Sequence, residues 1–292
     1  MPLGIISFFR ETWYNVKMKK YIKSFGFILL YLLIYFIIQT ITGLVLAVMG
    51  SGISFVSEEF SEYLISYLNS NFSVILIISI FLSFALFSII YSLRGKNIVT
   101  DCKLKGGNPG ESVLYGGMFG FSANFVIIII LAKLMSFKFL EQTFEQYDSQ
   151  VTSVIAQGSF LSTLVGVGII GPIFEEIMFR GVISREFDEL FSPKVVIVLQ
   201  GLLFGVYHMN IIQGSYATLL GIFLAYTVYK TNSIWPSIAA HIVMNTTSLL
   251  FNLPLFETIL HSFPLFILAL VIVFFVLSIR HFTGLKSLDQ YS

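Results

Sequence analysis

Charged side chains are scarce in this chain. Of its 292 residues, 11% are Asp, Glu, Lys or Arg, whereas 56% are hydrophobic, and the mean hydropathy is +0.87. A soluble domain carries about 25% charged residues, because its surface has to face water. The shortage of charge argues against a soluble enzyme, a nucleic-acid-binding protein and a disordered scaffold. It indicates a protein that crosses a membrane several times.

Cysteine is almost absent as well. The single Cys102 excludes an intrachain disulfide framework and a cysteine-based metal cluster, and we expect it to be an unreactive thiol in a loop. The formal net charge is only +1, so the chain lacks the basic patch that nucleic-acid binding needs. The 31 Phe and 14 Tyr residues suit lipid-facing and interfacial surfaces.

Long uncharged segments are what the sequence has instead. A helix that spans a bilayer needs about 20 mostly apolar residues. A polar break at 210–215 divides one of the uncharged segments into two short helices, so we predict an all-α, polytopic membrane protein with about eight transmembrane helices. The segments lie between Lys23 and Glu58, Glu62 and Arg94, Glu111 and Lys133, Asp148 and Glu175, Lys194 and Lys230, Lys230 and Glu257, and Glu257 and Arg280.

The loop charges predict the orientation. If both termini are cytoplasmic, Lys133 and Lys138 are the only basic residues of the 17 on the outer side, as the positive-inside rule favours. The N-terminal apolar run is too long for a cleaved signal peptide, so we interpret it as a retained first span. We expect a multi-pass protein of a bacterial plasma membrane. The acidic residues on the outer side are Glu58, Glu59, Glu62, Glu141, Glu145, Asp148 and Glu257.

No soluble domain or internal repeat interrupts the spans, and the polar loops around 94–112 and 136–157 are too short to fold alone. We therefore expect residues 1–292 to form a single membrane domain. Within it we predict three N-terminal accessory spans in 1–155, a catalytic helical core of spans four to seven in 156–252, and the last span with a cytoplasmic tail in 253–292.

Three polar motifs break the general avoidance of charge inside the spans. Ionisable groups in a membrane are costly and are functional candidates by default. At a rise of about 1.5 Å per residue, the acidic and histidine groups of these motifs lie about 13–21 Å below the cytoplasmic surface. Three helices can thus bring them to one buried level. The motifs are Glu175-Glu176-x-x-x-Arg180, Phe204-x-x-x-His208 and His241-x-x-x-Asn245.

Helical spacing separates the two glutamates. Residues four apart share a helix face, so Glu176 can pair with Arg180, while Glu175 points elsewhere into the bundle. Each feature has a structural explanation of its own: an ion pair, a packed histidine, or an asparagine that bonds to a neighbouring helix. The combination with an unpaired Glu175 favours a catalytic site.

In this order and spacing, the motifs resemble those of the CAAX protease and bacteriocin-processing (CPBP) intramembrane proteases, also called the Abi family. The resemblance covers about 160–250 and includes the tripeptide at 179–181. It implies an eight-span hydrolase that cleaves peptides near the cytoplasmic face of the membrane, with its active site opening toward the cytoplasmic half.

The resemblance also implies roles for the motif residues. Glu175 would act on a water as general base with help from His208, while His241 and Asn245 would stabilise the oxyanion. The supporting residues would be Glu176, Arg180 and Phe204.

Metal use stays open at this stage. The family is commonly described as a metalloprotease, and His208 and His241 with a carboxylate would suit zinc. The same residues can also activate water without a metal.

Other activities are weaker or remain open. The chain has no His-Glu-x-x-His motif, which argues against a zincin-type protease, and Asp148 falls in a predicted loop, which argues against an aspartyl intramembrane protease. A non-catalytic membrane regulator or immunity protein, acting through a partner such as a sensor kinase, is the alternative. A proton or ion pathway is less favoured, because the ionisable groups cluster at one level.

The expected partners are membrane lipid and a peptide or membrane-protein substrate. We favour bacterial peptide processing, such as maturation of a leader-bearing bacteriocin or pheromone precursor or self-immunity, over a prenyl-protein role. The reasons are the short chain and the excess of Lys over Arg.

Overall fold

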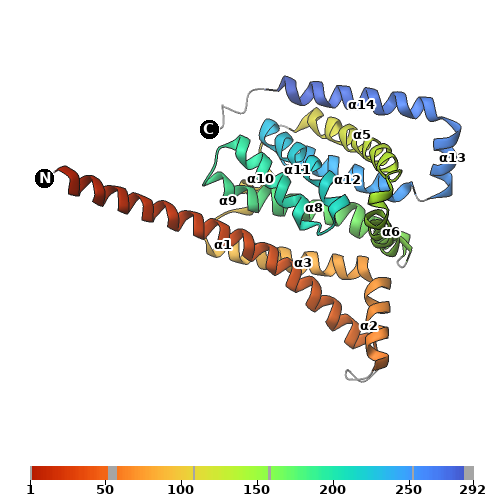
Figure 1. Ribbon diagram of the computed structural model, residues 1–292, viewed down its shortest axis with the longest axis horizontal. Helices are drawn as coiled ribbons and strands as arrows, with labels where there is room; N and C mark the ends of the chain where they lie inside the picture. Colours follow the sequence, from red (N-terminus) through yellow and green to blue (C-terminus); the bar gives the residue numbers. More distant parts are fainter. Residues whose placement is uncertain (1, 52–57, 108, 157–158, 252, 286–292) are drawn as a thin grey trace.

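The computed structural model describes residues 2–51, 58–107, 109–156, 159–251 and 253–285 (Figure 1). Every regular element within these ranges is a helix, which confirms the all-α prediction. The predicted tail beyond residue 285 lies outside the described residues. The helices are α1 (Pro2–Ser51), α2 (Glu58–Ser70), α3 (Phe72–Leu93), α4 (Ile98–Asp101), α5 (Gly110–Leu134), η1 (Lys138–Leu140), α6 (Glu141–Ala156), α7 (Phe160–Thr163), η2 (Leu164–Ile170), α8 (Gly171–Glu176), η3 (Ile177–Ile183), α9 (Ser184–Asp188), α10 (Pro193–Tyr207), α11 (Ile211–Thr231), α12 (Trp235–Leu250), α13 (Pro254–Ser262) and α14 (Pro264–Gly284).

The described residues contain six helices long and apolar enough to cross a membrane. A seventh is reached if α12 and α13, which are bent by 92°, form one broken span, and α10 is a shorter apolar helix. The chain is thus a multi-pass membrane protein, although the predicted number of eight spans and the side of the termini stay predictions. The six are Met18–Met49, Phe72–Leu93, Gly110–Leu134, Phe160–Asp188, Ile211–Thr231 and Pro264–Gly284.

The predicted break at 210–215 is misplaced: the helices are interrupted at 208–210, and 211–215 belong to α11. Helix α10 ends at Tyr207, and Met209 has a left-handed φ of 49°, which ends the helical path. Asn210 then caps α11, since its side-chain oxygen accepts hydrogen bonds from the backbone N–H groups of Ile212 and Gln213. As a result, His208 lies on a turn between two helices.

The prediction of a loop at 136–157, with Asp148 in it, is wrong. Most of this segment is helix α6, and Asp148 is part of that helix. Apolar residues at helical spacing explain the helix: Phe144 is buried and Tyr147 is half-buried on the same face. Tyr147 lies 3.3 Å from the hydroxyl of Tyr216, which joins α6 to α11.

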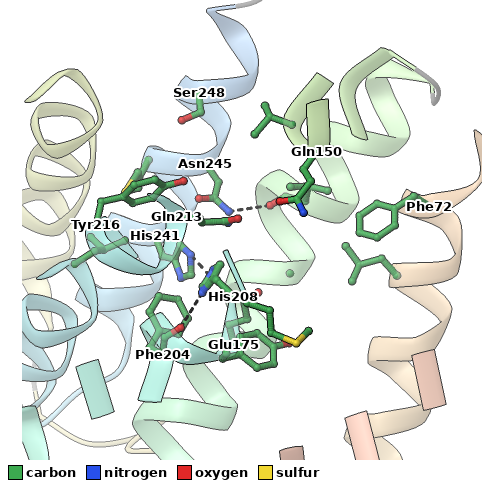
Figure 2. Close-up of a pocket in the computed structure, with 18 of the residues that line it drawn as sticks. Phe72, Gln150, Glu175, Phe204, His208, Gln213, Tyr216, His241, Asn245 and Ser248 are labelled. Atoms are coloured by element: carbon green, nitrogen blue, oxygen red, sulfur yellow. Dashed lines mark hydrogen bonds and ion pairs between the residues drawn. The ribbon is translucent and has the colours of Figure 1, made fainter. Parts of the chain in front are cut away.

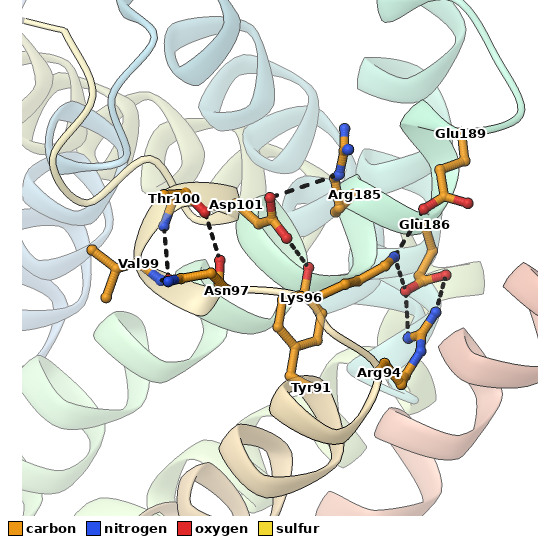
Figure 3. A network of polar contacts seen from close by, with 10 residues as sticks. All are labelled: Tyr91, Arg94, Lys96, Asn97, Val99, Thr100, Asp101, Arg185, Glu186 and Glu189. Carbon is orange, nitrogen blue, oxygen red and sulfur yellow. Dashed lines mark hydrogen bonds and ion pairs between the residues drawn. The ribbon is translucent and has the colours of Figure 1, made fainter.

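The predicted loop at 94–112 contains the short helix α4 and a network of ion pairs (Figure 3). Arg94 binds both carboxylate oxygens of Glu186, at 2.6 and 3.1 Å, and Lys96 binds one of them at 2.8 Å. The Glu186 side chain is 0% exposed. We call Arg94, Lys96, Glu186 and Glu189 the loop cluster; it fastens this connector to α9.

Cys102 follows α4 and is fully buried. Burial raises the pKa of its thiol to about 12, which agrees with the expectation of an unreactive thiol. The thiol packs against Gly181 of η3, where an added Cβ would lie only 2.1 Å from the Cys102 sulfur. The connector therefore rests directly on the helical segment that carries Arg180.

Helices pack in a series that places the motif-bearing segments at the centre. Helix α14 contacts α5, α5 contacts α12, α12 contacts η2 and α8, and α3 lies between η2 and α1 (Figure 1). Two glycines allow the closest of these contacts, since a Cβ at Gly116 or Gly120 would meet the backbone of α12 at 2.2 or 2.0 Å. This packing fixes the helix that carries the third motif.

Candidate active site

One cavity of about 480 Å³ is lined by residues from all three motifs (Figure 2). Glu175, His208, His241 and Asn245 all line it. They come from α8, from the turn after α10, and from α12. The structure therefore brings together the four residues that the sequence marks as catalytic candidates.

The paired charges lie beneath the cavity. Arg180 binds Glu176 through Nη1 and Oε1 at 2.9 Å, and both side chains are 0% exposed. Arg180 also donates through Nη2 to the carbonyl of Gly221 at 3.2 Å. The ion pair predicted from the four-residue spacing is present, and it anchors the motif helix to α11.

Glu175 is different from its neighbour. Its side chain is 21% exposed and lines the cavity, and its Oε2 lies 3.7 Å from Nε2 of His241. That distance exceeds the range of a hydrogen bond but lies within reach of electrostatic attraction. Glu175 thus has no direct cationic partner from its own helix, as the sequence predicts, although a histidine of α12 stands close to it.

His241 stands between the two glutamates. Its Nδ1 lies 2.9 Å from Oε1 of Glu176. Because an ionised carboxylate can only accept hydrogen bonds, this contact assigns the proton to Nδ1. The other ring nitrogen, Nε2, faces Glu175. The buried ion pair therefore fixes the orientation of a histidine at the cavity wall.

His208 is held by the end of its own helix. Its Nδ1 donates to the carbonyl of Phe204 at 2.8 Å. This carbonyl is free to accept because the last carbonyls of a helix lack partners within the helix. A neutral His208 consequently keeps Nε2 as an acceptor.

Phe204 orients several side chains at once. Its ring is 1% exposed and meets the rings of His208 and His241 edge to face, with centroids 4.7 and 5.7 Å apart. The guanidinium of Arg180 lies over the same ring at 4.5 Å. These contacts fit the supporting role that the family resemblance implies.

Asn245 is tied to the motif helix from the opposite side. Its Nδ2 donates to the carbonyl of Val167 at 3.1 Å. Val167 belongs to the π-helical segment η2, and π-bulges of this kind are frequent at functional sites. The side-chain amide has a second N–H, which can serve a ligand.

Several lining residues escaped sequence reasoning. Tyr35 comes from α1, and Gln213 and Tyr216 come from α11. Tyr35 is only 5% exposed, and its ring centroid lies 6.1 Å from that of Tyr207, the residue before His208. No motif marks Tyr35, because nothing local to α1 reveals that it will face residues far along the chain. Gln213 did have a signal, as it lies in the predicted polar break.

His208 and His241 are the candidate metal ligands of the cavity. Among the residues that the structure describes, no three His, Cys, Asp or Glu side chains are grouped so that they could hold one metal ion. His208 and His241 therefore do not combine with Glu175 into a three-ligand set in this geometry.

Comparison with known proteins locates the same segment. Residues 157–247 match the model of the family described as "Type II CAAX prenyl endopeptidase Rce1-like". The resemblance to CAAX-type intramembrane proteases is confirmed. A Bacillus subtilis (strain 168) protein named "Putative membrane peptidase YdiL" is 30% identical over 102 residues, which are 35% of this chain and 41% of that protein. The match thus spans less than half of that relative's length. No solved structure matches the chain.

The matched segment contains all three motifs. It begins just before α7 and ends within α12, so it includes every residue of the candidate site from Glu175 to Asn245. The CAAX-type match and the B. subtilis relative both support a protease in the membrane. Helices α1 and α3, which add Tyr35 and Phe72 to the cavity, lie outside the matched segment.

Proposed function

We propose that this protein is an intramembrane endopeptidase in which Glu175 activates the water that attacks a peptide bond. The observation that carries the proposal is the contrast between adjacent glutamates. Glu176 is bonded to Arg180 and His241, while Glu175 faces a cavity that is also lined by two histidines and an asparagine. A carboxylate of this kind, beside a cavity and without a bonded cation, suits a general base.

The first step is activation of the water. Glu175 accepts a proton from the water, and Nε2 of His208 accepts a second hydrogen bond that orients it, since Nδ1 is occupied by the carbonyl of Phe204. The water oxygen then bonds to the carbonyl carbon of the substrate. General-base catalysis of this kind typically contributes about 10²- to 10⁴-fold in rate.

The second element is stabilisation of the negative oxygen that forms. His241 can donate to this oxygen through Nε2 when both ring nitrogens carry a proton, because Nδ1 already donates to Glu176. Asn245 adds its second N–H. Loss of one such donor typically costs about 10²- to 10³-fold in rate.

The last step is release of the amine. Protonated Glu175 returns its proton to the leaving nitrogen as the C–N bond breaks. The products are a carboxylic acid and an amine, which become a carboxylate and an ammonium by proton transfer, and Glu175 is again ionised. Glu176 and Arg180 take no part in proton transfer; they hold His241 and the helix in place.

The proposed substrate is a membrane-associated or leader-bearing peptide in a bacterial plasma membrane, reached from the cytoplasmic half. Maturation of a bacteriocin or pheromone precursor, or self-immunity, would fit such an enzyme. The support is the depth estimate for Glu175 and His241 and the likeness to a bacterial membrane peptidase.

The test is a comparison of peptides from cells that carry the wild type or the Glu175→Gln variant. We expect one or more membrane-derived peptides to disappear in the variant while the protein still inserts in the membrane. Glu145→Gln is the matched control, since Glu145 is an exposed carboxylate of α6 outside the cavity. Identical peptide pools from wild type and Glu175→Gln would contradict the proposal, and would favour a non-catalytic regulator.

A further inference from the structure

The cavity wall is almost free of charge. Among the described residues that line it, Glu175 is the sole Asp, Glu, Lys or Arg. Arg180 contributes nothing to the wall, since it is enclosed and bound to Glu176. The remaining polar groups are amides, hydroxyls and the two imidazoles: Gln39, Gln150, Gln213, Asn245, Ser248, Tyr35, Tyr147, Tyr207, Tyr216, His208 and His241.

This wall disfavours charged groups on a ligand. A carboxylate that entered would lose its water, meet no lysine or arginine among the described lining residues, and face Glu175. An ammonium would find Glu175 as its partner and would occupy the catalytic base. Only uncharged segments can lie beside Glu175 without either penalty.

The apolar part of the wall suits ordinary side chains. It comes from α1, α3, the turn after α10, α11 and α12, so it surrounds the catalytic groups on several sides (Figure 2). Apolar side chains of a peptide can replace water at these surfaces. The residues are Phe36, Phe72, Leu76, Met209, Leu220, Met244 and Leu249.

Gln213 supplies a group for the peptide backbone. Its own backbone N–H is satisfied by the side chain of Asn210. Within the described ranges, its side-chain amide makes no hydrogen bond, and Figure 2 shows it in the cavity among Asn245, His241 and His208. A primary amide donates and accepts at once, so it matches the N–H and C=O of an extended peptide.

Resting on the peptidase function above, we propose that the cavity takes an internal, uncharged stretch of extended peptide and that Gln213 binds its backbone. A prenylated C-a-a-X tail differs from such a substrate, because the residues after its cysteine end in a free carboxylate. The proposal therefore separates this chain's substrate from the tails named in the description of the matching family.

The first test uses a randomised decapeptide library, acetylated and amidated, with the purified full chain in lipid nanodiscs. The Glu175→Gln variant serves to capture peptides and the wild type to cleave them. We expect the captured pool to be depleted about tenfold in Asp, Glu, Lys and Arg at the central positions. The same library with free C-terminal carboxylates within three residues of the scissile position should be captured about tenfold less. A captured pool with the charge content of the input, or no captured pool, overturns the proposal.

The second test concerns Gln213. Gln213→Leu, made in the Glu175→Gln background, should weaken the Kd of a captured peptide about three- to tenfold, the range for one lost hydrogen bond. In the otherwise wild-type chain, Gln213→Leu should raise KM by a similar factor and leave kcat within about twofold. Gln146→Leu, an exposed glutamine of α6 outside the cavity, is the control and should change neither value. Unchanged Kd and KM in Gln213→Leu overturn its assigned role.

The outcomes separate the two proposals. Equal cleavage of charged and uncharged peptides by the wild type overturns the inference and leaves the peptidase intact. Selective capture of uncharged peptides without any cleavage by the wild type contradicts the peptidase itself.

Discussion

Two buried groups of charges in this molecule use the same residue types for different ends. In the active-site cluster (Glu175, Glu176, Arg180 and His241), one carboxylate is bonded to Arg180, and the other lies 3.7 Å from Nε2 of His241. In the loop cluster, both oxygens of Glu186 accept from Arg94, and Lys96 adds a third bond. Glu175 lines the cavity, whereas Glu186 is not among the residues that line it.

A reactive carboxylate differs from a structural one in its bonding partners and in its access to a ligand. Burial alone does not decide, because Glu186 is more buried than Glu175, at 0% against 21% exposed. What decides is whether the oxygens are already saturated by cations and whether a ligand can reach them. Three variants and one treatment test this difference, in order of decreasing expected effect.

The largest expected effect is on catalysis. Glu175→Gln keeps the size of the side chain but removes the base, so the cleavage rate should fall by about 10²- to 10⁴-fold. The melting temperature should change little, since Glu175 forms no direct ion pair at hydrogen-bond distance. Initial rates and thermal unfolding of the purified variant in proteoliposomes measure both. A rate within tenfold of wild type would refute Glu175 as the base.

The next effect is on stability. Glu186→Gln leaves Arg94 and Lys96 without their shared carboxylate, and breaking a buried pair costs about 3–5 kcal/mol of unfolding free energy. The cleavage rate per folded molecule should stay within about threefold of wild type. The residues bonded to Glu186, Arg94 and Lys96, do not line the cavity.

Glu189→Gln is the control for this change. Glu189 is 30% exposed and pairs with Lys96, so its loss should cost about 0–1 kcal/mol. The unfolding free energies of both variants are measured by chemical unfolding. If Glu186→Gln and Glu189→Gln lose the same amount, the three bonds to Glu186 add no more stability than the exposed pair.

A smaller effect is expected where the connector packs on η3. In Gly181→Ala, the new Cβ would lie 2.1 Å from the sulfur and 2.9 Å from the Cβ of Cys102, so the connector has to shift. Overpacking of this kind costs about 1–3 kcal/mol. Cys102→Ala removes the nearest atom, so the double variant should unfold at a higher temperature than Gly181→Ala alone. If the changes in melting temperature of Gly181→Ala and Cys102→Ala simply add in the double variant, the packing explanation is contradicted.

The smallest expected effect is that of metal removal. The described residues bring no three metal ligands together, so the active-site cluster should work through its own charges. Prolonged treatment with a chelator should leave the cleavage rate within about twofold of the untreated enzyme. Loss of activity that added Zn²⁺ restores would show that a metal belongs to the site.

Local spacing explains which parts of the site the sequence could predict. The pairing of Glu176 with Arg180 follows from four-residue spacing within one helix, and the structure has it. The bond from His241 to Glu176 joins residues 65 positions apart, so only the packing of α12 on α8 creates it. The same holds for Tyr35, which reaches the cavity from α1.

The fold shows the same division. Uncharged runs located the apolar helices, because hydropathy acts locally along the chain. Helix α6 escaped prediction because its apolar side chains are few, and Phe144 and Tyr147 become meaningful only once α11 is in place. From the sequence, Arg94 and Lys96 only indicate the orientation in the membrane. Their bonds to Glu186 depend on a helix far along the chain.

The ratio of two cleavage rates tests most directly whether Glu175 is the catalytic base. Glu175→Gln and Glu186→Gln are reconstituted in the same vesicles, and initial rates on one captured peptide are expressed per folded molecule. We expect Glu186→Gln to cleave about 10²- to 10⁴-fold faster than Glu175→Gln, since only Glu175 acts on the water. Equal rates for the two variants would contradict it.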